Sequence, residues 1–377
     1  MLNMIALLKE LVACQSLTPY DAGCQEVLIR HLKHWDFRVT QLPFNDAENF
    51  WATPHTNPNP RFVFAGHTDV VPVGNLVEWQ FDPFQATEHQ GLVYGRGVAD
   101  MKGALAAMMA AFEQFAHDFP VQSTEVGFLI TSAEEGPSQW GTPIVLDYLQ
   151  EKRTQFDWCV VGEPSCETQL GDVIKNGRRG SLTGRLIVEG KQGHIAYPHL
   201  ALNPIHASAP FLQSFLSCKW DVGNADFQPT QLQISNIHAG TGAGNVIPGQ
   251  LELLFNFRYS PEVNAAELMQ KTEDELKKHN LSYQIEWTHF GEPFLTKPEK
   301  LTQSLCFAIE EIAGIKPQLS TSGGTSDARY IAKTGAQVVE FGLCNQNIHQ
   351  VNESIALKDI NQLKNIYYRL LVKLLVC

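Results

Sequence analysis

Acidic and imidazole side chains follow four apolar, strand-like runs of this chain. They are His67 and Asp69 after the run 61–66, Glu134 and Glu135 after 125–133, Glu163 after 157–162, and His349 a few residues after 336–342. Because ligand sites in open α/β sheets lie beyond the carboxyl ends of the strands, we expect these side chains to gather there. Carboxylates packed together repel one another unless a cation neutralises them. Mixed histidine and carboxylate ligands suit zinc or a similar first-row ion, so the sequence predicts a metal site.

Asp100 adds a further carboxylate in the glycine-containing segment GRGVADMKG (95–103). Taken alone, Asp100 is better explained as a helix N-cap and His349 as a loop histidine. These separate explanations do not account for the gathering of two histidines and four carboxylates at one sheet edge. These side chains are too many for one tetrahedral ion that keeps an open coordination position. Two ions about 3.5–4 Å apart could bind most of them. The carboxylate left over, taken here as Glu134, is a natural general base beside a metal-bound water.

The elements that must position these groups are alternating strand-like and helix-like runs. Strand-like runs at 61–66, 125–132 and 157–162 alternate with helical runs at 101–117 and near 142–153. This alternation predicts an α/β fold with a mixed, largely parallel sheet flanked by helices.

Residues 182–289 have a different pattern of strand, helix, two strands, helix and strand. Apolar side chains alternate along one of these strands, from Leu251 to Phe257. This βαββαβ order is that of a ferredoxin-like domain. We therefore expect a discontinuous α/β domain that carries the metal site, 1–179 and 293–377, and a smaller inserted domain, 180–292.

The composition of the 377-residue chain disfavours several classes of function. A formal net charge of -12 argues against a nucleic-acid partner. An acidic chain also repels anionic ligands at long range, so an anionic substrate would need local arginines. No run approaches the roughly 20 apolar residues of a membrane span, and Lys9 and Glu10 interrupt the N-terminal apolar segment, unlike in a secretory leader. None of the eight cysteines forms a CxxC pair, so we expect reduced thiols in a soluble, cytoplasmic protein without membrane partners.

Five motifs along the chain resemble those of the metal-dependent family of aminoacylases, deacetylases and carboxypeptidases. They are GHTDVVP, GRGVADMKG, TSAEEG, VVGEPS and GNVIP. The resemblance implies a zinc-exopeptidase-like fold with two zinc ions per subunit and cobalt as a substitute. The first ion would be held by His67, Asp100 and Glu163. The second would be held by His349, Asp100 and Glu135, so that Asp100 bridges the two ions.

The same resemblance implies roles for three further side chains. Glu134 would be the general base, and Asp69 would orient His67, since residues two apart in an extended chain point the same way. His194, in GKQGHIAYPH (190–199), would reach the active site of the partner subunit and stabilise the oxyanion. Taken alone, His194 is a surface-loop histidine. With that role, the expected assembly is a homodimer joined through the inserted domain, which would also close as a lid.

Three more motifs, NGRRGS, STSGGTSDARYIA and NIHQVNE, narrow the resemblance to members that hydrolyse a succinylated amino acid. The expected substrate is therefore a small anionic molecule whose carboxylates fit arginine forks. The residues at substrate-contacting positions are Arg178, Ser181, Tyr197, Asn245, Arg258, Gly324, Thr325 and Asn345. For Arg258, a surface salt bridge remains the alternative. The alternative functions are an acetylornithine deacetylase or dipeptidase on the same scaffold, and a non-catalytic, metal-stabilised binding protein.

Overall fold

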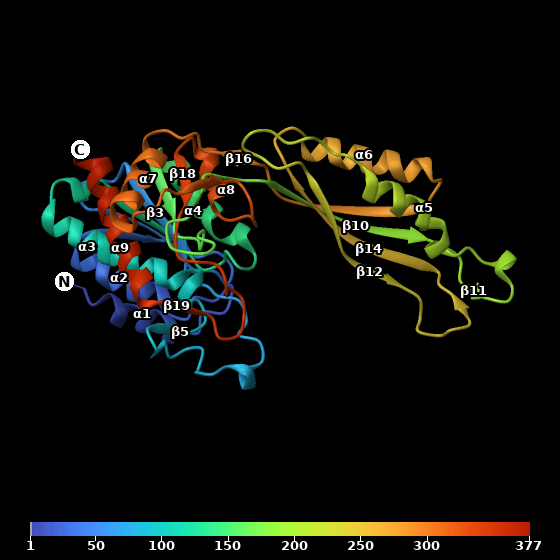
Figure 1. Ribbon diagram of the computed structural model, residues 1–377, viewed down its shortest axis with the longest axis horizontal. Coiled ribbons are helices and arrows are strands. Elements are labelled where there is room, and N and C mark those ends of the chain that lie inside the picture. The colour runs from blue at the N-terminus through green and yellow to red at the C-terminus, as the bar shows by residue number, and fades with distance from the viewer. Residues whose placement is uncertain (1) are drawn as a thin grey trace. The chain divides into compact units, whose positions relative to one another are not determined.

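An eight-stranded sheet forms the centre of the larger of two units in the computed structural model, which describes residues 2–377 (Figure 1). Unit 1 comprises the described residues up to Gly177 together with Leu295–Ser320 and Ser326–Cys377. Unit 2 comprises Arg178–Phe294 and Thr321–Thr325. The chain therefore leaves unit 1 and returns to it, and each unit has its own hydrophobic core.

The loop 321–325 makes its contacts inside unit 2, although the predicted boundaries put it with the outer segments of the chain. Thr321 Oγ1 donates a hydrogen bond to the main-chain oxygen of Asp226 at 2.6 Å. Arg178 Nη1 donates to the main-chain oxygen of Ser322 at 2.8 Å. Two such contacts between distant segments hold the loop against unit 2, and no local sequence pattern encodes them.

The sheet of unit 1 is mixed and largely parallel, as predicted. Its strand order is β1-β2-β6-β3-β7-β18-β8-β17, and the four neighbours β6, β3, β7 and β18 run parallel. Every residue of β3, β6 and β7 is buried, which is typical of parallel strands covered on both faces. The strands are β1 (Phe37–Gln41), β2 (Asn49–Pro54), β3 (Phe62–His67), β6 (Val126–Thr131), β7 (Trp158–Val161), β8 (Val173–Lys175), β17 (Gln318–Ser320) and β18 (Gln337–Glu340).

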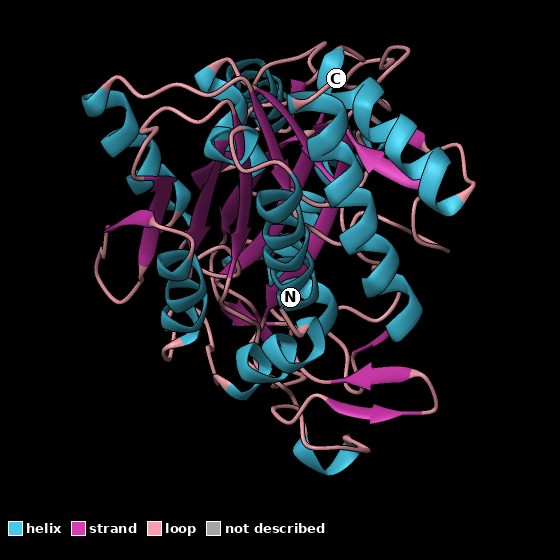
Figure 2. Ribbon diagram, turned by 90° about the vertical axis from the view of Figure 1, so that its left-hand side faces the viewer, coloured by secondary structure: helices cyan, strands magenta, loops and turns pink. Residues whose placement is uncertain are grey.

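Helices cover the sheet, and Figure 2 shows several of them in front of the strands. In Figure 1, α3 and α9 lie on one side of β3, and α4 and α8 lie on the other. The helices are α1 (Met4–Ala13), α2 (Cys24–His34), α3 (Gly103–Asp118), α4 (Thr142–Lys152), α7 (Lys300–Ala313), α8 (Ala328–Ile331) and α9 (Leu357–Leu375). Tyr367 on α9 donates to the main-chain oxygen of Phe341 at 2.6 Å and so ties this helix to the end of β18. Across residues 2–377, no helix combines the length and apolar character that a bilayer crossing requires.

A three-stranded ribbon in the order β19-β5-β4 and several short turns complete unit 1. The strands are β4 (Thr87–His89), β5 (Leu92–Tyr94) and β19 (Ser354–Ala356), and the turns are η1 (Leu76–Glu78), η2 (Val98–Lys102), η3 (Gln122–Glu125), η4 (Ser138–Trp140) and η6 (Ala332–Thr334). Two short strands, β9 (Gly177–Arg178) and β16 (Phe294–Leu295), stand where the chain passes between the units. The ribbon matters for the site because β5 leads directly into the segment that contains Asp100.

Unit 2 has the predicted βαββαβ order around an antiparallel sheet, β12-β14-β10-β15. Its elements are β10 (Gly180–Glu189), β11 (Gly193–His194), η5 (Pro198–Leu200), α5 (Pro204–Ser217), β12 (Gln231–Ala239), β13 (Val246–Ile247), β14 (Gln250–Tyr259), α6 (Ala265–Lys278) and β15 (Tyr283–Gly291). The alternating apolar side chains of β14 are buried, and helices α5 and α6 lie on one side of the sheet (Figure 1). This sheet order is that of a ferredoxin-like fold.

Candidate metal centre

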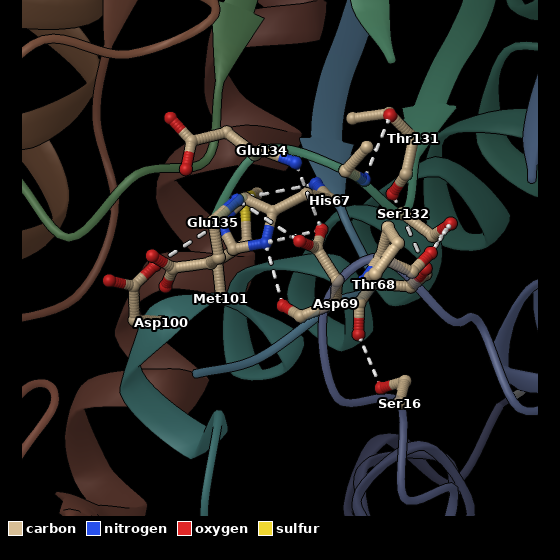
Figure 3. A network of polar contacts seen from close by, with 12 residues as sticks. Ser16, His67, Thr68, Asp69, Asp100, Met101, Thr131, Ser132, Glu134 and Glu135 are labelled. Carbon is tan, nitrogen blue, oxygen red and sulfur yellow. Dashed lines mark hydrogen bonds and ion pairs between the residues drawn. The ribbon is translucent and has the colours of Figure 1, made fainter. Parts of the chain in front are cut away.

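The carboxyl ends of three neighbouring parallel strands deliver side chains to one place in unit 1, and Figure 3 shows those that follow β3 and β6. His67 is the last residue of β3, and the ladder pairs it with Thr131, the last residue of β6. Glu134 and Glu135 follow the end of β6, and Glu163 follows the end of β7. Because the three strands are aligned in parallel, their ends bring the imidazole and the carboxylates together.

Two buried carboxylate oxygens, Asp100 Oδ1 and Glu163 Oε1, lie near the buried His67 Nε2, and none of these three atoms has a hydrogen-bond partner. His67 Nε2 lies 3.3 Å from Asp100 Oδ1 and 3.7 Å from Glu163 Oε1. The His67 ring donates from Nδ1 to the main-chain oxygen of Asp69 at 2.9 Å, which leaves the Nε2 lone pair directed at the carboxylates. Since partnerless buried polar atoms are costly, a shared cation would stabilise this arrangement. One donor atom each of His67, Asp100 and Glu135 lies within 4.8 Å of the others, and the same holds for His67, Glu134 and Glu163, so the cluster fits a divalent ion.

A second set of donors adjoins the first through Asp100. His349 Nε2 lies 3.2 Å from Asp100 Oδ2 and 2.8 Å from Glu135 Oε1. Asp100 thus points one carboxylate oxygen toward His67 and the other toward His349. A carboxylate in this position can bridge two ions, so the donor set is large enough for a pair of metals.

Burial and crowding shift the pKa values of the carboxyl groups in opposite directions. Burial raises the pKa of Glu134 well above its usual range, and the charge of Glu163 raises it further. Burial also raises the pKa of Glu163, to which the charge of Asp100 adds. Burial also acts to raise the pKa of Asp100, but its close contacts with His349 and His67 outweigh burial and lower this pKa. Carboxyl groups with raised pKa values hold protons that a divalent cation would displace.

The two histidines respond to the same carboxylates. Although burial lowers the pKa of His67, its contacts with Asp100 and Asp69 raise that pKa well above its ordinary value. Hydrogen bonds to Asp100 and Glu135 raise the pKa of His349 to about 10. Protons on these rings therefore compete with metal ions for the same nitrogen atoms.

Asp69 holds the site together differently from the expectation that its side chain orients His67. The ring of His67 bonds to the main-chain oxygen of Asp69, and the carboxylate Oδ1 lies 3.5 Å from Nδ1. The carboxylate instead accepts hydrogen bonds from the main-chain N–H groups of Glu134 at 3.2 Å and Glu135 at 3.0 Å (Figure 3). Since Asp69 is fully buried, this single residue fixes both the imidazole and the loop of the glutamate pair.

Lys102 is a buried charge beside the site that the sequence did not single out. Its Nζ donates to the main-chain oxygens of Leu11 at 2.9 Å and Cys14 at 2.8 Å, at the carboxyl end of α1. A cation there interacts favourably with the carbonyl groups at the carboxyl end of the helix. Lys102 thereby ties the segment of Asp100 to α1. Its place in GRGVADMKG was the available signal, but the motif does not reveal an internal contact.

Asp327, in the motif STSGGTSDARYIA, was also missed. Its Oδ2 accepts a hydrogen bond from Thr142 Oγ1 at 2.7 Å. Burial raises the pKa of Asp327, and its charge in turn contributes to the raised pKa of Glu134. Asp327 therefore belongs to the electrostatic surroundings of the candidate base.

His194, Tyr197 and Asn245 come together on an exposed ribbon of unit 2. Strands β11 and β13 pair there, and the Ile195 N–H donates to the main-chain oxygen of Asn245 at 3.2 Å. The Ala196 N–H donates to His194 Nδ1 at 3.1 Å, so the neutral ring carries its proton on Nε2. The ring centroids of His194 and Tyr197 are 5.7 Å apart. His194 can therefore present an N–H donor to a ligand.

Arg178, Ser181 and Arg258 gather at the other end of β10. Ser181 stands opposite Arg258 in the β10–β14 ladder, whereas His194 follows the far end of β10, after Glu189. The strand rise puts roughly 25 Å or more between Ser181 and His194 within unit 2. The candidate substrate contacts of this unit thus form two separate groups.

The remaining predicted contacts fall in both units. Gly324 and Thr325 belong to the loop of unit 2 that Arg178 holds through Ser322. Asn345 lies in unit 1, where its N–H donates to the main-chain oxygen of Cys166 at 2.9 Å. The contact of these residues with a substrate stays a prediction.

Comparison with known proteins assigns the chain to a family. The model of peptidase family M20/M25/M40 matches residues 63–373, which is most of the chain. The chain belongs to this family. A protein from Pseudoalteromonas atlantica named succinyl-diaminopimelate desuccinylase is 50% identical over 373 residues, 99% of each chain. A protein of the same name from Hahella chejuensis is 53% identical over 367 residues, 97% of this chain and 96% of the relative.

A solved structure of the same family shares the fold. The M20 family metallo-carboxypeptidase Sso-CP2 from Sulfolobus solfataricus aligns over 99% of each chain with a TM-score of 0.78 and 17% sequence identity. At that identity the likeness concerns the fold alone. The family membership and the fold class that the sequence motifs predict are therefore confirmed.

Proposed function

We propose that this chain is a metal-dependent amidohydrolase that cleaves N-succinyl-LL-2,6-diaminopimelate to succinate and LL-2,6-diaminopimelate. The observation that carries the chemistry is the convergence of His67 Nε2, Asp100 Oδ1 and Glu163 Oε1, all buried and without hydrogen-bond partners. The substrate follows from two relatives named succinyl-diaminopimelate desuccinylase, which are 50% and 53% identical over nearly the whole chain. This reaction belongs to diaminopimelate and lysine biosynthesis.

The proposed metal centre holds two zinc ions, with cobalt as a substitute. His67, Asp100 and Glu163 would hold one ion, and His349, Asp100 and Glu135 would hold the other. When bound, such ions would polarise the amide carbonyl and acidify a water molecule at the site. The two oxygens of Asp100, directed at different histidines, support the bridging role.

Glu134 is the proposed general base. Asp69 accepts a hydrogen bond from the main-chain N–H of Glu134, and a carboxylate oxygen of Glu134 lies within 4.8 Å of donor atoms of His67 and Glu163. Burial raises the pKa of Glu134 in the metal-free protein, and bound cations nearby would favour the ionised form that can accept a proton. Glu134 would accept a proton from the attacking water and pass it to the nitrogen of the leaving amine as the amide bond breaks.

His194 is proposed to stabilise the oxyanion in the active site of a second copy of the chain. Within one subunit, His194 and the pair Ser181 and Arg258 lie at opposite ends of β10, roughly 25 Å or more apart. One small substrate cannot contact both ends. A histidine from a second copy would remove this conflict, and the proton on its Nε2 makes it a suitable donor.

The surface of unit 2 supports a homodimer through this unit. Strand β12 stands at the edge of its sheet, with mostly exposed side chains. Large apolar side chains are exposed around the His194 ribbon, namely Ile195, Tyr197, Leu200, Leu202 and Ile205. An edge strand and a cluster of exposed apolar side chains are features that association with a second copy would cover.

Arginine side chains suit the carboxylates of the proposed substrate. Arg178, Ser181 and Arg258 gather at one end of β10, and the loop of Gly324 and Thr325 lies against Arg178. A guanidinium fork matches carboxylate geometry. Such local positive charge would offset the net charge of -12 that repels an anionic ligand at a distance.

We also propose a cytoplasmic location. The eight cysteines, all within the described part of the chain, are free thiols. Free thiols are typical of a reducing compartment. This location would also suit an enzyme of amino-acid biosynthesis.

A comparison of substrates tests the proposed function. The zinc-loaded protein should hydrolyse N-succinyl-LL-2,6-diaminopimelate with a kcat/KM at least about 100-fold higher than N-acetylornithine or a dipeptide. The reverse preference would indicate a deacetylase or dipeptidase on the same fold. Metal-loaded protein that hydrolyses none of the three would favour a non-catalytic binding protein.

A further inference from the structure

A buried ion pair lies between the segment that carries Asp100 and the loop that carries His349. Arg96 Nη1 is 2.7 Å from Glu353 Oε2, and both side chains are 1% exposed. Neither residue belongs to the two donor sets. The partners of the pair, however, are main-chain groups of the two segments that supply metal donors.

The carboxylate of Glu353 is surrounded by donors from the Asp100 segment. Oε1 accepts from the main-chain N–H groups of Ala99 at 2.9 Å and Asp100 at 3.2 Å. Oε2 accepts from the main-chain N–H of Gly97 at 3.0 Å in addition to Arg96 Nη1. Each oxygen thus serves two donors, which only an ionised carboxylate can do on both sides. Glu353 therefore fixes the backbone from which the Asp100 side chain extends.

Arg96 reaches the His349 loop from the other side of the same carboxylate. Its Nη1 donates to the main-chain oxygen of Gln350 at 3.1 Å, one residue after His349. Its Nη2 donates to the main-chain oxygen of Pro72 at 3.2 Å, and its guanidinium carbon lies 5.4 Å from the centre of the Trp79 ring. The planar fork thereby connects three segments of unit 1 around one charge.

The His349 loop needs such support because its backbone is strained. His349 has φ +60° and Asn352 has φ +62°, in the left-handed region that side chains other than glycine disfavour. Conformations of this kind persist when the surrounding structure holds them. The main-chain oxygen of Glu353 accepts from the Gly95 N–H at 3.0 Å, so the strained loop ends where it meets the Asp100 segment.

We propose that Glu353, together with Arg96, is a positioning residue that keeps Asp100 and His349 in register and so sets the affinity of the ion they share with Glu135. This inference rests on the proposed two-ion function. His67 and Glu163 depend on the ends of β3 and β7 instead. The ion at His67 and Glu163 should therefore depend less on the pair.

Metal titration of the full-length Glu353→Gln variant tests the inference. The side-chain NH₂ of glutamine cannot accept hydrogen bonds, so at least two of the four donors lose their acceptor. Metal-free protein is titrated with Zn²⁺ and bound zinc is counted, and a parallel Co²⁺ titration follows the visible spectrum. Wild type should bind two ions per subunit. In the variant, the affinity for the ion at His349 and Glu135 should fall about 10- to 100-fold, and the affinity for the other ion, which shares Asp100, should fall less.

Two further variants keep the test decisive. Glu311, whose side chain is 42% exposed and 2.8 Å from Arg369, provides a Glu→Gln control outside the site, and Glu311→Gln should leave both affinities unchanged. Arg96→Lys keeps a positive charge beside Glu353 but loses the fork to Gln350 and Pro72. This variant should weaken the binding of the same ion to a smaller extent. It provides the test if Glu353→Gln does not fold.

Three results would count against the inference. A folded Glu353→Gln variant with two wild-type affinities would overturn it. Equal weakening of both ions would also overturn it, because the pair would then act only through Asp100, which both ions share, and not on the register of Asp100 and His349. Wild-type protein that binds a single ion would refute the two-ion function itself, and with it this inference, and the wild-type titration alone identifies that case.

Discussion

The metal centre of unit 1 and the His194 ribbon of unit 2 use the same kinds of side chain in opposite surroundings. His67 is 1% exposed and faces two carboxylates, whereas His194 is exposed beside Tyr197, which is 56% exposed. Carboxylates repel one another, and mobile carboxylate side chains would move apart in water. A site that holds several of them close together therefore needs side chains fixed at strand ends. A group that meets its ligand only after assembly can remain on an exposed turn.

His67 and His194 also differ in whether the Nε2 atom offers a lone pair or a proton. The Nδ1–H of His67 donates to the main-chain oxygen of Asp69, so Nε2 presents a lone pair. His194 Nδ1 accepts from the Ala196 N–H, so Nε2 presents a proton. One main-chain contact thus leaves the His67 ring suited to the proposed metal binding and the His194 ring suited to the proposed hydrogen-bond donation.

The largest expected effect is at the buried centre. Glu134→Gln should lower kcat about 10³-fold or more, because an amide cannot accept the proton of the attacking water. The bound metal should be unchanged, because Glu134 is the donor left over by the two ion sets. Steady-state kinetics and metal analysis of the same preparation measure both quantities.

A matched control separates this role from a general effect of the substitution. Glu151, exposed on α4, offers a Glu→Gln change outside the site that should leave kcat unchanged. Loss of one ion from Glu134→Gln would make Glu134 a ligand. Retention of more than about a tenth of wild-type kcat would reject it as the base.

The next largest effect is at the exposed ribbon. His194→Ala should lower kcat about 10²-fold with an unchanged metal content, because it removes one oxyanion donor and no ligand. His194 belongs to unit 2, whereas all the metal donors belong to unit 1. Normal turnover of the variant would remove His194 from the mechanism.

Mixed dimers show which subunit uses His194. Co-expression of His194→Ala and Glu134→Gln chains with different tags gives mixed dimers in which only one site has both groups, if His194 acts on the partner. A random mixture should then regain about a quarter of wild-type activity, since half the dimers are mixed and half of their sites are complete. No gain over the separate variants would mean that His194 acts in its own subunit.

The smallest expected effect is a pH dependence of metal-induced stability. The raised pKa values of Glu134, Glu135 and Glu163 stabilise the metal-free fold below their unfolded values, and this stability is lost as pH rises through the raised values. The pKa of His349, raised to about 10, likewise stabilises the metal-free fold at low pH, and this stability is lost at higher pH values than for the glutamates. Asp100 has a lowered pKa, so the stability that its ionised form contributes to the fold is lost only as the pH falls into the acid range.

Bound metal ions replace these protons, so the metal-loaded protein should not lose this stability as the pH rises. The difference in Tm between zinc-loaded and EDTA-treated protein should widen by roughly 5 °C or more from about pH 5.5 to about pH 8.5. Glu163→Gln, which cannot ionise, should flatten this trend. A difference that narrows with rising pH would contradict the proposed competition between protons and metal.

The strands and helices that carry the site were predictable because their patterns are long and regular. The run 61–66 is continuously apolar and becomes β3, which ends at His67. Alternation from Leu251 to Phe257 likewise predicts β14, whose apolar face is buried. The three-residue strands β8 and β17 were missed, because so few residues show no period and their pairing comes from distant segments.

By itself, the sequence determined which side chains follow strand ends, and hence that imidazole and carboxylate groups would meet at one edge of a sheet. Only the tertiary structure decided which atoms face each other. Arg96 and Glu353 are 257 residues apart, and the Asp69 carboxylate bonds to N–H groups 65 and 66 residues away. A local pattern records the period of an element because neighbours share its backbone geometry. Contacts between distant residues depend on how several elements pack at once, and no short stretch of sequence contains that information.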